Sequence, residues 1–139
     1  MRRSTRKYRP DVIAVDTNVV VRLLMGDDAE QTGVAMRLFD LEAIYIAKSV
    51  ILETEWVLRR GYRQTPLAIA RALENLIALP NVTCEEIGGV QHALTWHRSG
   101  MDFADALHLA AGARATRFAT FDRDMIKVAK RLDLAVSEP

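Results

Sequence analysis

The chain has 139 residues, half of them hydrophobic and 27% charged, with a formal net charge of +1. This composition excludes global disorder and suits a single domain with a hydrophobic core. Its one cysteine, Cys84, excludes an intramolecular disulfide framework and fits the reducing cytoplasm, where we expect the protein. No apolar stretch predicts a secretory signal or a membrane span.

The first ten residues, MRRSTRKYRP, contain five basic residues and no acidic one, so the rest of the chain is acidic. A basic arm of this kind can bind nucleic acid or another anionic surface. A short basic run is equally typical of a flexible leader, and we favour that interpretation. We therefore divide the chain into a basic, flexible leader at 1–10 and a single domain at 11–139.

Strands and helices are predicted to alternate along this domain. Short apolar, β-branched runs predict strands at 12–15, 43–47, 82–86, 118–120 and 134–136. Helices are expected after Thr17, at about 28–41, 49–60, 66–79, 89–98, 102–115 and 123–131. Thr17 or Asn18 is expected to cap the first of these and Ser49 the third. The alternation predicts a three-layer α/β/α sandwich with a central, mainly parallel sheet.

Four acidic residues in apolar surroundings lie at the ends of predicted elements: Asp16, Glu53, Asp105 and Asp122. A lone carboxylate in such surroundings costs free energy unless it is paired or bound to a cation. Asp16 and Asp122 come after strands, at the edge where parallel α/β sheets bind ligands. If the fold brings the four together, their repulsion raises their pKa values, and a hard cation such as Mg²⁺ or Mn²⁺ relieves it.

Further polar residues flank these carboxylates. Asp102 and Asp105 are three residues apart on one helix face, so one can bind a metal directly and the other through water. Asp102 can equally be a simple helix cap, and Asp122 and Asp124 can either close the acidic cluster or form another capping turn. Three side chains are candidates to hydrogen-bond a carboxylate, water or phosphate oxygen: Thr17, Asn18 and Thr120.

Glu53 has a competitor on its own helix. Glu55 points about 160° away from it on a helical wheel, so one of the two faces the site and the other is expected to be solvated. We choose Glu53. His108 lies three residues after Asp105, but no second histidine or cysteine is placed to join it in a transition-metal site. A hydrogen-bonded structural role is therefore expected for His108.

The ordered motifs DTN (16–18), VILETEWVLR (50–59), DFADAL (102–107) and TFDRD (120–124) resemble a PIN domain. Within that superfamily they are similar to VapC-type toxins of bacterial toxin–antitoxin pairs. The resemblance extends from Val12 to Val136. It implies a metal-dependent endoribonuclease, with Asp16, Glu53, Asp105 and Asp122 as catalytic and metal-binding residues and Asp102 and Asp124 as accessory metal ligands. The basic leader departs from the family, where DTN usually comes within a few residues of the start.

The resemblance also implies a cofactor and partners. One or two Mg²⁺ or Mn²⁺ ions would activate a water molecule and neutralise charge on the scissile phosphate. RNA would be the substrate, the protein would form a homodimer, and a cognate antitoxin would silence it; no membrane is expected to take part. The candidates to hold the RNA backbone are Arg22, Lys48, Arg59 and Arg123. The candidates to line an antitoxin groove are Met25, Trp56, Leu58 and Trp96; the alternative, which we favour for each residue taken singly, is an ordinary place in the core.

Other functions stay open. A phosphatase or phosphotransferase would use Asp16 as a covalent nucleophile, but that chemistry wants a second aspartate two residues on, where Asn18 stands. A receiver-like domain would need an aspartate on the strand at 82–86, which has none. A PIN-like binding module without catalysis would need no metal.

Overall fold

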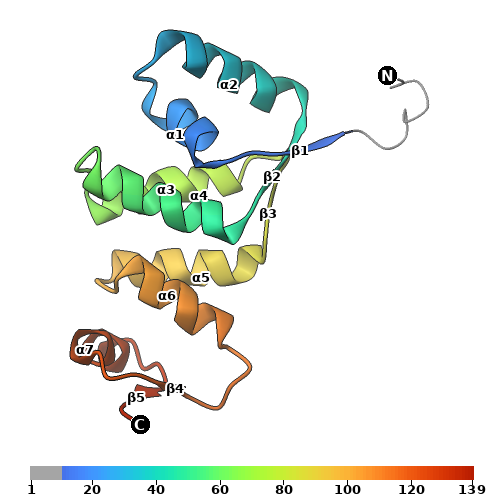
Figure 1. The fold of residues 1–139 in the computed structure, drawn as a ribbon. Coiled ribbons are helices and arrows are strands. Elements are labelled where there is room, and N and C mark those ends of the chain that lie inside the picture. The colour runs from blue at the N-terminus through green and yellow to red at the C-terminus, as the bar shows by residue number, and fades with distance from the viewer. Residues whose placement is uncertain (1–10) are drawn as a thin grey trace.

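The computed structural model describes residues 11–139, so the basic leader expected at 1–10 lies outside the described residues. One or two helices lie between each strand and the next (Figure 1). The strands are β1 (Val12–Ala14), β2 (Ala43–Ile46), β3 (Val82–Cys84), β4 (Phe118–Ala119) and β5 (Val136–Ser137). The helices are α1 (Thr17–Met25), α2 (Ala29–Leu41), α3 (Lys48–Arg60), α4 (Pro66–Ile77), α5 (Ile87–Arg98), α6 (Phe103–Ala111) and α7 (Arg123–Arg131). None of these helices is long and apolar enough to cross a membrane.

Every strand pair within residues 11–139 is parallel. β2 lies between β1 and β3, with Val12 opposite Ala43 and Ile44 opposite Val82, and β4 pairs separately with β5. Parallel neighbours need crossover connections, and helices supply them here. The predicted three-layer α/β/α fold with a mainly parallel sheet is confirmed. The division of the strands into a group of three and a group of two was not predicted.

The hydrophobic core holds the helices that carry the acidic residues. Phe103 at the start of α6 is fully buried and stacks edge-on against the ring of His97 on α5, with 5.5 Å between ring centroids. Burying a side chain of this size stabilises the fold by roughly 1.5–3 kcal/mol. Because Phe103 directly follows Asp102, this burial also fixes the position of the Asp102 backbone.

Aspartate side chains begin several helices by accepting a backbone N–H from the residue three positions on. These caps are Asp16 (3.2 Å), Asp28 (3.0 Å), Asp102 (3.2 Å) and Asp122 (3.1 Å). The prediction that Thr17 or Asn18 caps α1 is wrong, because the backbone of Asp16 is extended and Thr17 already lies in the helix. Local capping chemistry therefore accounts for the orientation of three of the predicted site carboxylates.

Ser49 does not cap α3, contrary to prediction. The helix begins at Lys48, and Ala47 before it offers no side-chain hydrogen bond. Instead Oε1 of Glu85, just beyond β3, accepts the backbone N–H of Lys48 at 2.9 Å. This cap comes from 37 residues further along the chain, which no local pattern around Ser49 could reveal.

Candidate active site

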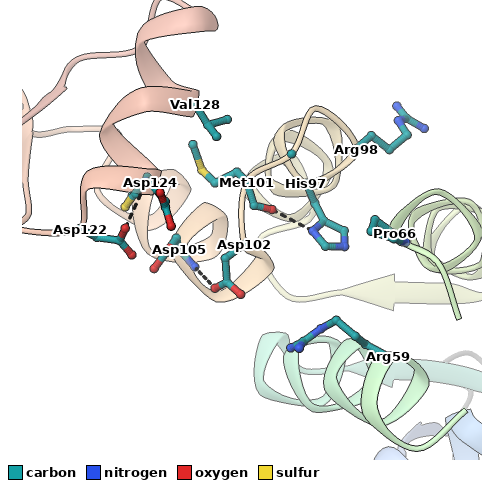
Figure 2. A pocket seen from close by; sticks show the side chains of 12 residues that line it. Arg59, Pro66, His97, Arg98, Met101, Asp102, Asp105, Asp122, Asp124 and Val128 are labelled. Carbon is teal, nitrogen blue, oxygen red and sulfur yellow. Dashed lines mark hydrogen bonds between the residues drawn. The ribbon is translucent and has the colours of Figure 1, made fainter. Parts of the chain in front are cut away.

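The starts of α6 and α7 form the acidic wall of an open cleft of about 650 Å³ (Figure 2). In that view the acidic side chains lie on the left and the basic and histidine side chains on the right. The acidic lining consists of Asp102, Asp105, Asp122 and Asp124, and the opposite lining includes Arg59, His97 and Arg98. The cleft therefore brings four predicted site residues, from two helices, into one place.

The surroundings of Asp105 raise the pKa of its carboxyl group. It is half-buried, and this burial raises its pKa above the ordinary value. The charges of Asp102 and Asp122 raise it further, as does a hydrogen bond with Asp122, while His108 opposes the effect. The ionised form of Asp105 is therefore disfavoured in the folded protein unless a cation compensates.

Two short turns hold the neighbours of Asp105. Oδ2 of Asp102 accepts the backbone N–H of Asp105 itself at 3.2 Å. The backbone N–H of Asp122 donates to Oγ1 of Thr120 at 3.0 Å, which fixes the turn before α7. Each capping hydrogen bond occupies one carboxylate oxygen, so the capping role left open for Asp102 does not exclude a role in the cleft. Asp124 is exposed in the first turn of α7.

Asp16 and Glu53 are linked through Thr17. Thr17, which is buried, donates its hydroxyl to Oε1 of Glu53 at 2.6 Å. Asp16 and Asn18 line a separate cavity of about 530 Å³ between α1 and α2. Asp16 thus lines the cavity between α1 and α2, whereas Asp105 and Asp122 line the acidic cleft. Their joint role as metal ligands stays a prediction.

The pair Asp105–Asp122 nevertheless suits a divalent cation. Within residues 11–139 no three His, Cys, Asp or Glu side chains are close enough to share one ion. Mg²⁺ usually keeps several waters and needs one or two protein carboxylates, which this pair supplies. A cation would also relieve the repulsion that raises the pKa of Asp105. All-oxygen ligands favour Mg²⁺ or Mn²⁺ over a softer metal.

His108 differs from its predicted hydrogen-bonded structural role. Its side chain is exposed near the end of α6, and its influence on the site is electrostatic, because it lowers the pKa of Asp105. His97 on α5, in contrast, is buried and has a structural role. Its Nδ1 is 2.9 Å from the carbonyl oxygen of Met101.

The prediction that Glu55 is solvated is wrong, since it is 1% exposed whereas Glu53 is exposed. Oε2 of Glu55 accepts Nε–H of Arg59 at 2.8 Å and lies 3.8 Å from Nε2 of His97. Sequence reasoning missed this ion pair. The spacing of Glu55 and Arg59, four residues apart on a helix, is the signal that could have found it.

The basic residues predicted to hold RNA are distributed over different surfaces. Arg59 lines the acidic cleft, whereas Arg22 lines the cavity of Asp16. Lys48 is ion-paired with Glu86 near a third cavity, and Arg123 is exposed on α7. From this set, the cleft of Asp105 and Asp122 is lined by Arg59.

The predicted antitoxin-groove residues are also divided. Leu58 is 1% exposed and belongs to the core, so it is excluded from an accessible groove. Trp56 is half exposed, with the guanidinium of Arg60 5.9 Å from its ring centroid. Met25 and Trp96 are partly buried against the core.

A sequence model of the PIN domain matches residues 13–131, which is most of the chain. Searches of curated proteins and of solved structures gave no match. PIN domains are typically nucleases that use Mg²⁺ or Mn²⁺, which agrees with an acidic cleft rich in carboxylate oxygens. The extent of the match, together with the parallel α/β fold, shows that this chain belongs to the PIN domain family.

Proposed function

We propose that this protein is a metal-dependent endoribonuclease that cleaves phosphodiester bonds in RNA. The main support for this proposal is the environment of Asp105, a half-buried carboxylate whose pKa is raised by burial and by the charges of Asp102 and Asp122. Perturbed carboxylates in a cleft are the expected property of a hydrolytic site that operates with a cation. Arg59 at the same cleft supplies a positive group for a polyanionic substrate.

Asp105 and Asp122 would hold one ion, and Asp102 and Asp124 would act as accessory ligands through bound water, since no three such side chains within residues 11–139 are close enough to share one ion. When bound, Mg²⁺ or Mn²⁺ lowers the pKa of a water molecule so that it can attack phosphorus, and neutralises charge on the scissile phosphate. The capping hydrogen bonds of Asp102 and Asp122 orient their carboxylates before substrate arrives. A pre-oriented acceptor needs little rearrangement during the reaction.

Asp16 and Glu53 complete the proposed catalytic set. Their support is the order of the DTN and ETEW motifs together with the hydrogen bond between Thr17 and Glu53. Asn18 is proposed to hydrogen-bond water or phosphate beside Asp16, since both line one cavity. The complete set would bind one or two ions.

We also propose that the protein is the toxin of a toxin–antitoxin pair, acting in the cytoplasm as a homodimer. The support is the VapC-like motif order. A cognate antitoxin would silence the enzyme, and a basic antitoxin side chain would find complementary charge in the acidic cleft. The pairing would be tested by asking whether a protein encoded beside this chain copurifies with it and inhibits it. Removal of that protein should then restore ribonuclease activity.

The central test is cleavage of structured cellular RNA with Mg²⁺ or Mn²⁺. We expect discrete cuts from the wild type and from a control, Asp40→Asn, which removes an exposed carboxylate on α2. Asp105→Asn, Asp16→Asn and a chelator are each expected to abolish cleavage. Cuts that persist with the chelator or in Asp105→Asn would contradict the proposal.

A binding module without catalysis is the second candidate. The lack, within residues 11–139, of three His, Cys, Asp or Glu side chains that could share one ion favours it. Thermal unfolding with added Mn²⁺ discriminates the two functions. Absence of both a metal-dependent shift and RNA cleavage would support the binding module, whereas a shift with cleavage supports the nuclease.

A further inference from the structure

Glu55 on α3 is a buried carboxylate with a defined partner. It is 1% exposed, and a buried charge is tolerated when it is paired and hydrogen-bonded. Its Oε2 accepts Nε–H of Arg59 at 2.8 Å, and Nη2 of Arg59 lies 3.4 Å from Oε1. In contrast to an ion pair between two exposed side chains, this one has a buried partner, Glu55, whose position is restrained by the surrounding core.

The same carboxylate is packed against the segment that carries Asp102. Nε2 of His97 lies 3.8 Å from Oε2 of Glu55, and Nδ1 of His97 lies 2.9 Å from the carbonyl oxygen of Met101. His97 is 5% exposed and Met101 is 2% exposed, so the contacts form one buried unit. Glu55 therefore ties the position of Arg59 to that of the acidic wall of the cleft.

Arg59 keeps free donors directed to the cleft. A guanidinium has five N–H groups, and Glu55 takes the edge formed by Nε and one hydrogen of Nη2. The remaining donors, on Nη1 and Nη2, belong to a side chain that is 35% exposed and lines the cleft. In Figure 2 the tip of Arg59 lies below Asp102, whose charge adds to that of Glu55 in raising the pKa of Arg59.

A planar edge with two donors matches the oxygens of a phosphate group. Such a group is needed here, since the cleft presents four carboxylates to an anionic substrate. The other arginine of the lining, Arg98, is tied to the partly exposed Glu74 at 2.6 Å and lacks a buried anchor. Geometry and charge thus favour Arg59 over Arg98 for a fixed phosphate contact.

We propose that Glu55 is a positioning residue, which holds the guanidinium of Arg59 at the acidic cleft to bind one backbone phosphate of the RNA substrate. This inference rests on the proposed function. Glu55 does not touch the phosphate, and its effect on the substrate passes through Arg59. Removal of either residue should therefore remove the same phosphate contact.

The test uses the full chain and a fluorescein-labelled RNA oligonucleotide. Binding is measured at several KCl concentrations with Ca²⁺ in place of Mg²⁺, and KM and kcat are measured with Mg²⁺. The variants are Arg59→Ala, Arg59→Lys, Glu55→Gln, and Glu55→Gln combined with Arg59→Ala. The control is Arg60→Ala, the neighbouring exposed arginine that lies over Trp56. Thermal unfolding of each variant reports any loss of stability separately.

Arg59→Ala is expected to weaken binding and raise KM about tenfold, and to reduce the slope of log affinity against log salt by about 0.7, the value for one single-strand phosphate. Glu55→Gln should raise KM in the same direction with little change in kcat, and should add nothing in the Arg59→Ala background. Arg59→Lys, which keeps the charge without the fork, should bind with intermediate affinity. Arg60→Ala should match the wild type.

Unchanged binding and salt slope in Arg59→Ala would overturn the phosphate contact. An effect of Glu55→Gln that persists undiminished in the Arg59→Ala background would overturn the positioning role. If Glu55→Gln does not fold, Glu55→Asp, which retracts the carboxylate and keeps its charge, takes its place. If the wild type binds RNA but does not cleave it, the proposed nuclease function is contradicted, and the salt slopes still test the phosphate contact of Arg59. If the wild type neither binds nor cleaves RNA, both the nuclease function and the phosphate contact are overturned.

Discussion

Thr17 donates a 2.6 Å hydrogen bond from its hydroxyl to Oε1 of Glu53 and so joins the first residue of α1 to α3. Thr17 is buried and Glu53 is exposed, so a buried hydroxyl group fixes one oxygen of a carboxylate that is otherwise accessible to solvent. In the DTN motif the aspartate caps its own helix while the threonine orients a second acid 36 residues away. The motif is therefore a structural link between two of the predicted catalytic residues.

Thr17→Val keeps the shape of the side chain and removes this hydrogen bond. We expect it to lower the free energy of unfolding by about 1.5–3 kcal/mol, the usual contribution of a hydrogen bond to a charged group, with the lower end favoured because Glu53 is exposed. Urea unfolding measures the change. Thr17→Ser, which retains a hydroxyl, is the matched control. Equal stability of the valine and serine variants would mean that the bond contributes nothing.

Asp105→Asn is expected to stabilise the metal-free protein near neutral pH. The folded-state pKa of Asp105 is raised above 3.8, so the folded protein binds this proton more tightly than the unfolded chain. Stability therefore falls as pH rises from about 3.8 through the raised pKa, and the loss is complete above it. Urea unfolding between pH 4 and pH 7 should show a shallower loss in the variant than in Asp40→Asn. Parallel profiles would contradict the pKa shift.

Divalent metal should raise the melting temperature of the wild type, because an ion that binds the folded state alone stabilises it. The gain is about 2.7 kcal/mol at a metal concentration one hundred times the Kd. Asp105→Asn and Asp122→Asn should each lose this gain, and Asp40→Asn should keep it. Differential scanning calorimetry with Mn²⁺ provides the measurement. A shift that survives in Asp105→Asn would place the ion elsewhere, and the response of Asp16→Asn tests whether that residue shares the ion.

Cys84 should react slowly with iodoacetamide in the folded protein. Burial, with a smaller contribution from Glu85, raises the pKa of its thiol from 9.0 to about 11. Because the thiolate is the nucleophile, this shift alone slows alkylation at pH 8 by about a hundredfold relative to the ordinary thiol. The rate should recover in urea. Mass spectrometry against time measures both rates, and equal rates with and without urea would show that the thiol is accessible.

Much of the local structure could be predicted from short-range sequence patterns. A helix was predicted at about 66–79, and α4 begins at Pro66 with Thr65 as its N-cap. The helix predicted at 123–131 is α7. These predictions succeed because capping and helical periodicity depend on residues three or four positions apart. The same reasoning failed at Ser49, since the group that caps α3 is the distant side chain of Glu85.

The order of the acidic motifs was enough to determine the family. The PIN domain match covers residues 13–131, nearly the span over which the motifs occur. The sequence also identified Asp102, Asp105, Asp122 and Asp124 as residues of interest, and these share a cleft. What it did not reveal is that Thr17, directly after Asp16, donates a hydrogen bond to Glu53.

The choice between Glu53 and Glu55 shows the limit most clearly. Helical spacing established that the two carboxylates point in different directions, and so that their surroundings differ. Tertiary structure alone decided which one is buried, because the face of α3 that carries Glu55 meets His97 of α5 while Glu53 meets the hydroxyl of Thr17. Contacts between segments tens of residues apart depend on how whole helices pack, and no local pattern of charge or hydrophobicity encodes that packing.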